Sequence, residues 1–381
     1  MDAIIIGSNH WNTLGLIRSL GLNGVKPYLL LVNEHGETNY CAKSKYLSGC
    51  TIVKEYEEAL SFLRNKSNNT NNSPVLFPSS DGAEHMIDSH MDELKHYYTL
   101  PGINEQEGAV SYLMNKANQA LWSEDLGIPS ASTYLVDLAN LGKGIMQVGG
   151  ISPVIVKPAI SHEGSKADIK KCNTDLELSA HLCYLRDKGY NQCLVQEFID
   201  YDCQYVVHGA MLRNYTTIPY IILKNIREWP ETGGTGCFRS FINDNRIKGI
   251  VEGLLKSIRE YGYRGLFDIE LFGRNEDILL NEVNFRSSGV GYSMMHTKVF
   301  YPYYYYLDAK GVNTIELTKK YNCHHFVMNE LTDIYNVKHG TLSFFQWLRD
   351  VLKTKDFAFY NSKDMRPAVS YYWNWMKSIT R

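Results

Sequence analysis

Acidic, amide and basic side chains recur at short spacing in the second half of the chain, where their types could bind a metal ion and phosphate. They lie in the stretches Asp268-Ile269-Glu270-Leu271-Phe272 and Asn281-Glu282-Val283-Asn284-Phe285-Arg286. Alternate residues of a β-strand share a face, so Asp268 would point with Glu270. For the same reason Glu282 would point with Asn284 and Arg286. The apolar residues between them would fill the opposite face.

Carboxylates gathered on one face repel one another unless cations neutralise them. Ligands that offer only oxygen suit Mg²⁺, an ion that keeps several waters and bridges nucleotide phosphates. The pattern therefore predicts a metal–phosphate site. The alternative is a solvated outer face whose charges pair with lysines, but that alternative gives no reason for Arg286 to aim at the same place as Asn284.

Two lysines elsewhere are candidates for the cations that a phosphate site needs. Lys157 ends the apolar run that begins at Val154, and the polar loop after it can wrap phosphate oxygens with N–H and hydroxyl groups. Lys116 opens a predicted helix, where, taken alone, it would suit an ordinary solvated lysine equally well. The loop residues that we single out for phosphate contact are Ser161, Gly164 and Ser165.

A further segment could receive a nucleotide base. Glu197, Phe198 and Ile199 end another apolar run. There a backbone N–H and C=O could meet the edge of an adenine while Phe198 or Ile199 supports its face.

The first hundred residues alternate short β-rich runs with amphipathic stretches. The predicted strands are Ala3–Ile6, Pro27–Val32 and Val75–Phe77, and the predicted helices are Thr13–Leu22 and Tyr56–Leu63. This alternation indicates a parallel sheet with helices on both faces, and ligands of such sheets bind at the carboxyl ends of the strands. The turns at Gly7–Asn9 and Ser79–Asp81 should therefore lie beside a site. The G-x-G-x-x-G pattern of nicotinamide enzymes is absent from the first turn.

From about Met114 the predicted strands follow one another through hairpin connections, which is typical of an antiparallel sheet. The strands expected here are 154–158, 193–199, 204–211, 217–224, 265–272 and 277–283, and the helices are 115–126, 247–261 and 341–352. The tyrosine cluster Tyr301–Tyr306 suits packing against the sheet better than a stacking platform. The predicted fold class is α/β in the first part and α+β in the second.

The composition of the 381 residues argues against several classes of partner. A net charge of −2 gives no reason to expect nucleic acid, and no apolar run approaches the roughly 20 residues that cross a bilayer. The start, Met1–Gly7, lacks the features of a signal peptide. Eight cysteines without a C-x-x-C pair predict reduced thiols, and adjacent residues such as Cys323 and His324 rarely converge on one metal. We expect a cytoplasmic protein with neither a nucleic-acid nor a membrane partner.

The order of these motifs resembles the ATP-grasp superfamily. That order is Lys116, then Lys157-Pro158 with a small-residue loop, Glu197-Phe198-Ile199, Glu270, and Glu282-Val283-Asn284-Phe285-Arg286. The interval from Glu270 to Glu282 is similar to that in the biotin carboxylase and carbamoyl-phosphate synthetase branch. The stretch from Arg227 to Arg239, which contains Pro230 and Gly233-Gly234, looks like the R-x-x-P-x-x-G-G segment of a subgroup that includes D-aspartate ligases.

The resemblance implies an ATP-grasp fold with an N-terminal parallel α/β domain. That pre-ATP-grasp domain would cover residues 1–110. The nucleotide-binding domain would cover 111–310, with a lid at about 130–200, and a small helical and aromatic portion would cover 311–381.

The resemblance also implies a role for each candidate residue. Lys116 and Lys157 would contact phosphates, and the 161–165 loop would close over them. Glu197 to Ile199 would read adenine, and Gln204 stands where the family often has an acidic ribose ligand. The metal ligands of two Mg²⁺ ions would be Glu270, Glu282 and Asn284, with Asp268 as an alternative. Arg286 would face the transferring phosphate. The substrate-binding candidates are Ser80 and Asp81, because of their place at the end of a strand, and Arg227, Gly234 and Arg239. Each of these two arginines could equally well be an ordinary surface arginine.

The implied activity is that of an ATP-dependent ligase. It would join a carboxylate to an amine through an acyl phosphate, with an amino acid, a peptide or a cell-envelope or sugar precursor as substrate. The partners would be small molecules, and a homodimer stays open. Two alternatives also stay open: other ATP-grasp chemistry such as carboxy-phosphate formation on a small metabolite, and a nucleotide-binding protein without ligase turnover.

Overall fold

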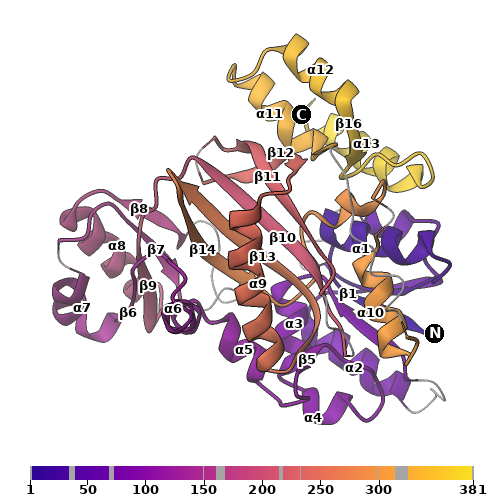
Figure 1. Cartoon of the computed structure of the whole chain (residues 1–381). Coiled ribbons are helices and arrows are strands. Elements are labelled where there is room, and N and C mark those ends of the chain that lie inside the picture. The colour runs from indigo at the N-terminus through magenta and orange to yellow at the C-terminus, as the bar shows by residue number, and fades with distance from the viewer. Residues whose placement is uncertain are drawn as a thin grey trace. The chain divides into compact units, whose positions relative to one another are not determined.

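The computed structural model describes residues 2–33, 39–67, 73–148, 150–159, 168–213, 218–231, 233–297, 299–313 and 325–379. Its helices and many of its strands are labelled in Figure 1. The chain divides into two compact units. Unit 1 comprises Met1–Val110, Tyr205–Asp268 and Asn284–Arg381, and unit 2 comprises Ser111–Gln204 and Ile269–Val283. Strands β13 (Tyr263–Arg274) and β14 (Asp277–Asn284) contribute residues to both units.

Unit 1 begins with the parallel sheet that the sequence predicts. Its strand order is β3-β2-β1-β4, and every neighbouring pair is parallel. The strands are β1 (Ala3–Ser8), β2 (Tyr28–Val32), β3 (Gly49–Val53) and β4 (Val75–Pro78), and the helices are α1 (Trp11–Leu22), α2 (Tyr56–Ser67), α3 (Asp81–Asp88) and α4 (Met91–Leu94). The sequence did not predict β3, because most of its residues are only partly buried and it lacks an apolar run.

Alternate residues of β1 enter two different hydrophobic cores. Ala3 and Ile5 pack in the core that includes α1, whereas Ile4 and Ile6 pack in a second core that includes residues of α2 and α3. All four are fully buried. A parallel strand that is buried on both faces reads as a continuous apolar run, which is why this strand could be recognised from the sequence.

The second sheet is mostly antiparallel. Its strand order is β14-β13-β10-β11-β12-β15-β16, with β5 (Gly102–Ile103) beside β13. The further strands are β10 (Cys203–Met211), β11 (Tyr220–Trp229), β12 (Thr235–Phe241), β15 (Phe326–Met328) and β16 (Thr354–Phe357). The predicted hairpin exists as β10 and β11, but β11 continues to Trp229 and therefore includes Arg227. Helices α5 (Ala109–Met114), α9 (Asn245–Glu260) and α10 (Tyr301–Ala309) complete this part of the chain.

The tyrosine cluster forms α10. Tyr301, Tyr304 and Tyr305 are buried in the core that includes α1, so the prediction of packing is confirmed.

Unit 1 ends in three helices, α11 (Glu330–Lys338), α12 (Phe344–Lys353) and α13 (Met365–Ile379). The sequence predicted that α12 begins at residue 341. It begins at Phe344, because the Ser343 side chain accepts a hydrogen bond from the Gln346 N–H at 3.2 Å and caps the helix there.

The segment between β16 and α13 is bonded to α1. The Arg18 guanidinium is buried and donates to the backbone oxygens of Ala358 and Phe359, and its Nε donates to the Asp364 carboxylate at 3.2 Å. Residues that lie far apart in the sequence therefore complete the same buried ion pair.

Unit 2 contains a four-stranded antiparallel sheet in the order β6-β9-β7-β8. Its elements are α6 (Lys116–Asp125), β6 (Thr133–Asp137), α7 (Leu141–Val148), β7 (Val154–Pro158), β8 (Lys170–Cys172), α8 (Asp175–Asp187) and β9 (Gln192–Glu197). In β7, Val154 and Val156 are buried in the core of this unit, whereas Lys157 is only partly buried. Strand alternation therefore directs Lys157 away from that core.

Across the described ranges, no helix has the length and apolar character required to cross a membrane.

Candidate functional site

Lys157 is held by side chains of the neighbouring strands in unit 2. Its Nζ donates to the Gln196 Oε1 on β9 at 2.9 Å, and the Gln196 Nε2 donates to the Thr133 Oγ1 on β6 at 2.9 Å. The three residues therefore share one face of the sheet. Because the partner of the ammonium is a neutral amide, this bond orients Lys157 without cancelling its charge.

The pKa of Lys157 is lowered to about 8. Desolvation is the main cause, and the nearby Lys116 charge adds to it, whereas Glu282 and Glu270 act in the opposite direction. These four residues therefore share one electrostatic environment within unit 2. An arriving anion would favour the charged form of Lys157.

Lys116 is positioned by the start of α6. The Asn115 side chain caps that helix, and the Lys116 Nζ donates to the Glu282 Oε2 at 3.2 Å. One turn later, the Gln119 side chain donates to the Val283 oxygen at 2.7 Å and accepts from the Val283 N–H at 2.8 Å. Gln119 therefore fixes the helix to the strand that carries Glu282. The sequence analysis missed Gln119, although its position three residues after Lys116 puts both on one helix face.

Glu270 accepts hydrogen bonds from two amides. The Gln204 Nε2 donates to its Oε2 at 2.8 Å, and the Asn281 Nδ2 donates to the same oxygen at 3.2 Å. The predicted ribose contact and a predicted metal ligand are thus hydrogen-bonded to each other. Both amides are neutral, so these two bonds hold the carboxylate in place without neutralising it.

The segment 197–199 lies at the end of β9. The Glu197 N–H donates to the Ser132 oxygen and the Phe198 N–H to the Pro153 oxygen. Ile199 is buried, and the Lys171 ammonium lies 3.6 Å from the centroid of the Phe198 ring. Two of the backbone donors that could have met an adenine edge are therefore used within unit 2.

The donor set of unit 2 fits a metal–nucleotide complex better than a protein-only metal cage. In the described part of the chain, no group of three or more His, Cys, Asp or Glu residues could hold a metal ion. Mg²⁺ is commonly bound by one or two carboxylates together with phosphate oxygens and water. Glu270 and Glu282 can supply such carboxylates, and the two lysines suit the phosphates.

Arg286 belongs to unit 1, where it contacts carboxylates. Its Nε lies 2.5 Å from the Asp81 Oδ1, and its Nη1 lies 3.9 Å from the Asp268 Oδ2. The Ser288 hydroxyl donates to the other oxygen of Asp268 at 2.8 Å. Asp81 begins α3, directly after β4. The carboxyl end of a parallel strand and the polar residues after β14 therefore meet within unit 1.

No family model matches the chain. A formate-dependent phosphoribosylglycinamide formyltransferase of Hydrogenovibrio crunogenus is 25% identical over 202 residues, which make up 49% of this chain and 49% of that protein. The chain therefore spans about half the length of the curated relatives that it matches.

Solved structures match more of the chain. The N5-carboxyaminoimidazole synthetase from Staphylococcus aureus complexed with ADP has a TM-score of 0.61 at 15% identity, over 82% of this chain and 78% of that chain. The L-amino acid ligase from Bacillus licheniformis has a TM-score of 0.59 at 13% identity, over 81% and 74%. The chain has the ATP-grasp fold.

The ATP-grasp fold agrees with the predicted class, because the protein combines a parallel sheet with antiparallel sheets. Unit 2 brings together Lys116, Lys157, Glu270 and Glu282. Asn284 belongs to unit 1 and is almost fully buried. The loop residues Ser161, Gly164 and Ser165 lie outside the described residues.

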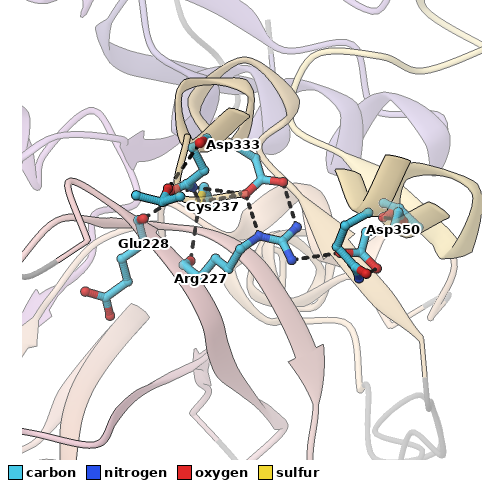
Figure 2. Close-up of polar contacts among 9 residues, drawn as sticks. Arg227, Glu228, Cys237, Asp333 and Asp350 are labelled. Atoms are coloured by element: carbon cyan, nitrogen blue, oxygen red, sulfur yellow. Dashed lines mark hydrogen bonds and ion pairs between the residues drawn. The ribbon is translucent and has the colours of Figure 1, made fainter. Parts of the chain in front are cut away.

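The arginines expected to bind substrate carboxylates find partners within the protein, and Figure 2 shows those of Arg227. The Arg227 Nε and Nη2 donate to the two carboxylate oxygens of Asp333 at 3.0 and 2.8 Å, and its Nη1 donates to Asp350 at 2.7 Å. Arg239 is buried and donates to the Asn225 Oδ1 at 2.7 Å and to the Tyr292 hydroxyl at 3.2 Å. The sequence suggested that Arg227 binds carboxylates of a substrate. In the structure it binds two carboxylates of the chain itself.

Two other substrate candidates have local structural roles. The Ser80 hydroxyl caps α3 by accepting from the Ala83 N–H at 3.3 Å, and it bonds to the Tyr56 hydroxyl at 2.8 Å. A Cβ atom at Gly234 would lie 2.0 Å from the Pro230 backbone oxygen. Only glycine therefore fits this turn without a backbone shift.

Glu84 is a carboxyl group near Arg286 that the sequence analysis did not select. Its side chain is fully buried, and neither of its oxygens has a hydrogen-bond partner among the described residues. Desolvation and the nearby Asp88 raise the pKa of Glu84 well above its usual value, against the opposing charge of Arg286. No sequence pattern distinguishes it, because its burial depends on packing.

Proposed function

We propose that this protein is an ATP-dependent ligase that joins a carboxylate to an amine through an acyl-phosphate intermediate. The observation that carries the proposal is the cluster of Lys116, Lys157, Glu270 and Glu282 in unit 2. Its lysines can neutralise phosphate oxygens, and its carboxylates can share a divalent cation with a triphosphate. The lowered pKa of Lys157 supports this function, because a desolvated cation interacts strongly with an anion that binds beside it.

Activation by phosphate is needed because a carboxylate and an amine at neutral pH form only a salt. Phosphoryl transfer from ATP gives the acid a good leaving group, and the amine then expels phosphate to leave an amide. The protein's part in such a reaction is mainly positioning and neutralisation of charge.

The proposed roles follow the residue types. Lys116 and Lys157 bind phosphates, and residues 197–199 support adenine. Glu270, Glu282 and Asn284 are the proposed ligands of two Mg²⁺ ions, with Asp268 as an alternative. Bound Mg²⁺ would supply neutralisation of charge at the transferring phosphoryl group. Gln204 orients Glu270 through the 2.8 Å hydrogen bond.

Arg286 is the proposed catalytic residue. Its guanidinium would stabilise charge on the transferring phosphate and then on the tetrahedral oxyanion. Asp81 is its positioning partner, because a 2.5 Å ion pair restricts the side chain to few rotamers. Arg227 has no substrate role in this proposal, since all three nitrogens of its guanidinium donate to Asp333 or Asp350.

The names of similar proteins are compatible with a carboxylate substrate. Formate and amino acids are both carboxylic acids, and these are the substrates that the names of the formyltransferase and the L-amino acid ligase contain. We propose small-molecule substrates in the cytoplasm, where ATP is available. We also propose residues 111–310 as the nucleotide-binding domain with a lid at about 130–200, preceded by a domain of residues 1–110 and followed by a portion of residues 311–381.

The proposal can be tested by screening pairs of acids and amines for phosphate release from ATP and Mg²⁺. A ligase should release phosphate only when both substrates are present, and the product mass should equal the sum of the two substrates less one water. The Lys157→Ala variant serves as the control for contaminating enzymes.

Two results would contradict the proposal. Phosphate release that needs bicarbonate but no other acid would indicate carboxy-phosphate chemistry. ATP binding without turnover on any pair would indicate a nucleotide-binding protein.

A further inference from the structure

Helix α12 packs within unit 1 through its polar side. Asp350 in this helix is buried, and the Gln346 Nε2 donates to both of its carboxylate oxygens at 3.2 Å. Figure 2 shows the Arg227 guanidinium between Asp333, which comes from α11, and Asp350. One arginine of β11 therefore holds both helices, and it holds α12 by a carboxylate rather than by an apolar residue.

The opposite side of α12 is apolar and exposed. Phe344, Phe345, Leu348 and Leu352 have 52%, 83%, 41% and 78% of their surface exposed. At about 100° per residue, these four positions fall within an arc of about 100° on the helix. A surface helix normally turns such a stripe toward the core. In α12 the apolar stripe faces outward instead, because the side that faces the protein carries Asp350, which is buried and paired with Arg227.

Basic residues border this stripe. Arg349 and Lys353 follow the apolar arc around the helix, and both are exposed. From residue 341 to residue 379, every exposed charged side chain is a cation: Arg349, Lys353, Lys355, Lys363, Arg366 and Lys377. The exposed charges of this segment are thus all positive in a chain whose net charge is −2.

The acidic residues of the same segment are all buried. Asp350 pairs with Arg227, Asp356 with His296 and His325, and Asp364 with Arg18. They therefore do not offset the basic surface.

Helix α13 repeats the arrangement. Its exposed apolar residues are Met365, Val369, Trp373 and Met376, which recur at the spacing of one helix face. Arg366 and Lys377 follow that stripe around the helix, and both are exposed.

We propose that the outer stripe of α12 binds the surface of an anionic lipid bilayer, with the helix lying in the plane of the interface. An exposed Phe and Leu stripe bordered by Arg and Lys is the pattern of interfacial helices. Apolar side chains enter the boundary of the headgroups, and the cations meet lipid phosphates. We expected no membrane partner from the sequence, because that prediction considered only segments long enough to span a bilayer.

A second copy of the chain fits this face less well than a bilayer. In a symmetric dimer the same patch meets itself, so Arg349 and Lys353 would approach their own copies. Like charges brought together in this way repel, whereas an anionic lipid surface attracts every exposed charge of the segment.

The test is sedimentation of the full chain with lipid vesicles. Vesicles of equal parts phosphatidylglycerol and phosphatidylcholine should bind the protein at least tenfold more tightly than phosphatidylcholine alone, and salt should weaken the binding. The double variant Phe345→Ser/Leu352→Ser should lose about tenfold or more in affinity for the anionic vesicles. The double variant Arg349→Gln/Lys353→Gln should lose roughly tenfold or more for these vesicles only.

Matched controls separate vesicle binding by α12 from nonspecific adsorption of the protein. Leu176 is 84% exposed on α8, and Lys256 is exposed on α9. Leu176→Ser and Lys256→Gln should leave vesicle binding unchanged. All the substituted side chains are exposed, and Asp350 is kept, so circular dichroism should match the parent protein.

Two outcomes would overturn the proposal. One is equal sedimentation with and without phosphatidylglycerol. The other is self-association of the parent chain, seen by light scattering without lipid, that the Phe345→Ser/Leu352→Ser variant abolishes; that result would make a second copy the occupant of this face.

Discussion

Unit 2 and unit 1 each place basic side chains among carboxylates, but they do so with different consequences. In unit 2, Lys157 donates to a neutral amide, and its pKa falls to about 8. In unit 1, Arg227 donates to two carboxylates, whose hydrogen bonds and charges outweigh desolvation and raise its pKa. An anionic ligand would therefore strongly stabilise the charged form of the lysine. The arginine is already neutralised by the chain, so it stabilises the structure.

The largest effect expected from this comparison is the loss of stability on Arg227→Met. Asp333 and Asp350 would be left buried without their cation, which costs about 3–5 kcal/mol. Thermal unfolding should show it, and the folded variant should keep its affinity for ATP. The exposed Arg246 provides the matched control, since Arg246→Met should change stability by no more than about 0.5 kcal/mol. A stable Arg227 variant with weakened substrate binding would show that Arg227 binds substrate and has no structural role.

A smaller effect, on rate rather than stability, is expected for Arg286→Ala. Loss of a transition-state donor should lower kcat by roughly 10²–10³ while ATP affinity stays within a few-fold. Arg286→Lys should recover only part of the rate, because an ammonium cannot reproduce a bidentate guanidinium. Steady-state kinetics and nucleotide titration separate the two quantities. If ATP binding is lost and turnover at saturating ATP is normal, Arg286 is a ground-state contact.

Lys157→Ala should weaken ATP binding by roughly 10- to 100-fold, the value of a hydrogen bond to a charged group. The fold should survive, since Lys157 is only partly buried and its partner is an amide. Calorimetric titration measures the affinity, and far-UV circular dichroism checks the fold. Lys170→Ala on the adjacent strand β8 is the control. Collapse of the Lys157 variant would mean that this lysine is structural, as Arg227 is.

The pH dependence of ATP binding should be the mildest of these effects. Lys157 is mainly charged below its pKa of about 8 and mainly neutral above it. Because phosphate favours the charged form, affinity should fall as the pH rises above 8, by at most about tenfold per unit. Titrations from pH 7 to 9.5 in buffers of different ionisation enthalpy should also detect proton uptake near pH 8. The Lys157→Arg variant should show neither trend, and an unchanged parent profile would argue against phosphate contact by Lys157.

The parts of the candidate site that could be predicted are those whose signal is local. Lys157 directly follows the apolar residues of a strand, and Glu270 and Glu282 lie on strands with clear alternation, so each could be recognised within a few residues. Arg227 also looked functional. Its partners Asp333 and Asp350 lie more than a hundred residues away, and no local pattern reveals that they bind it.

In the fold, too, the features with a local sequence signal could be predicted and the others could not. The buried strand β1 was predicted because both of its faces are apolar, whereas β3 was missed because most of its residues are only partly buried. The helix α12 was predicted, but its orientation was not. An amphipathic pattern indicates that a helix has two sides, and it takes the ion pair of Asp350 to decide which side faces inward.

The buried contact between Arg18 and Asp364 has a consequence for synthesis of the chain on the ribosome. The two residues are 346 positions apart. At typical translation rates, roughly 20 to 70 s pass between their additions to the chain. During that time the N-terminal parallel sheet has left the ribosome, but its buried guanidinium still lacks a counter-ion and the carbonyls that accept its hydrogen bonds. The parallel sheet is made well before Asp364 but is completed only after it, so a nascent chain stalled before Asp364 should expose α1 to chaperones and proteases.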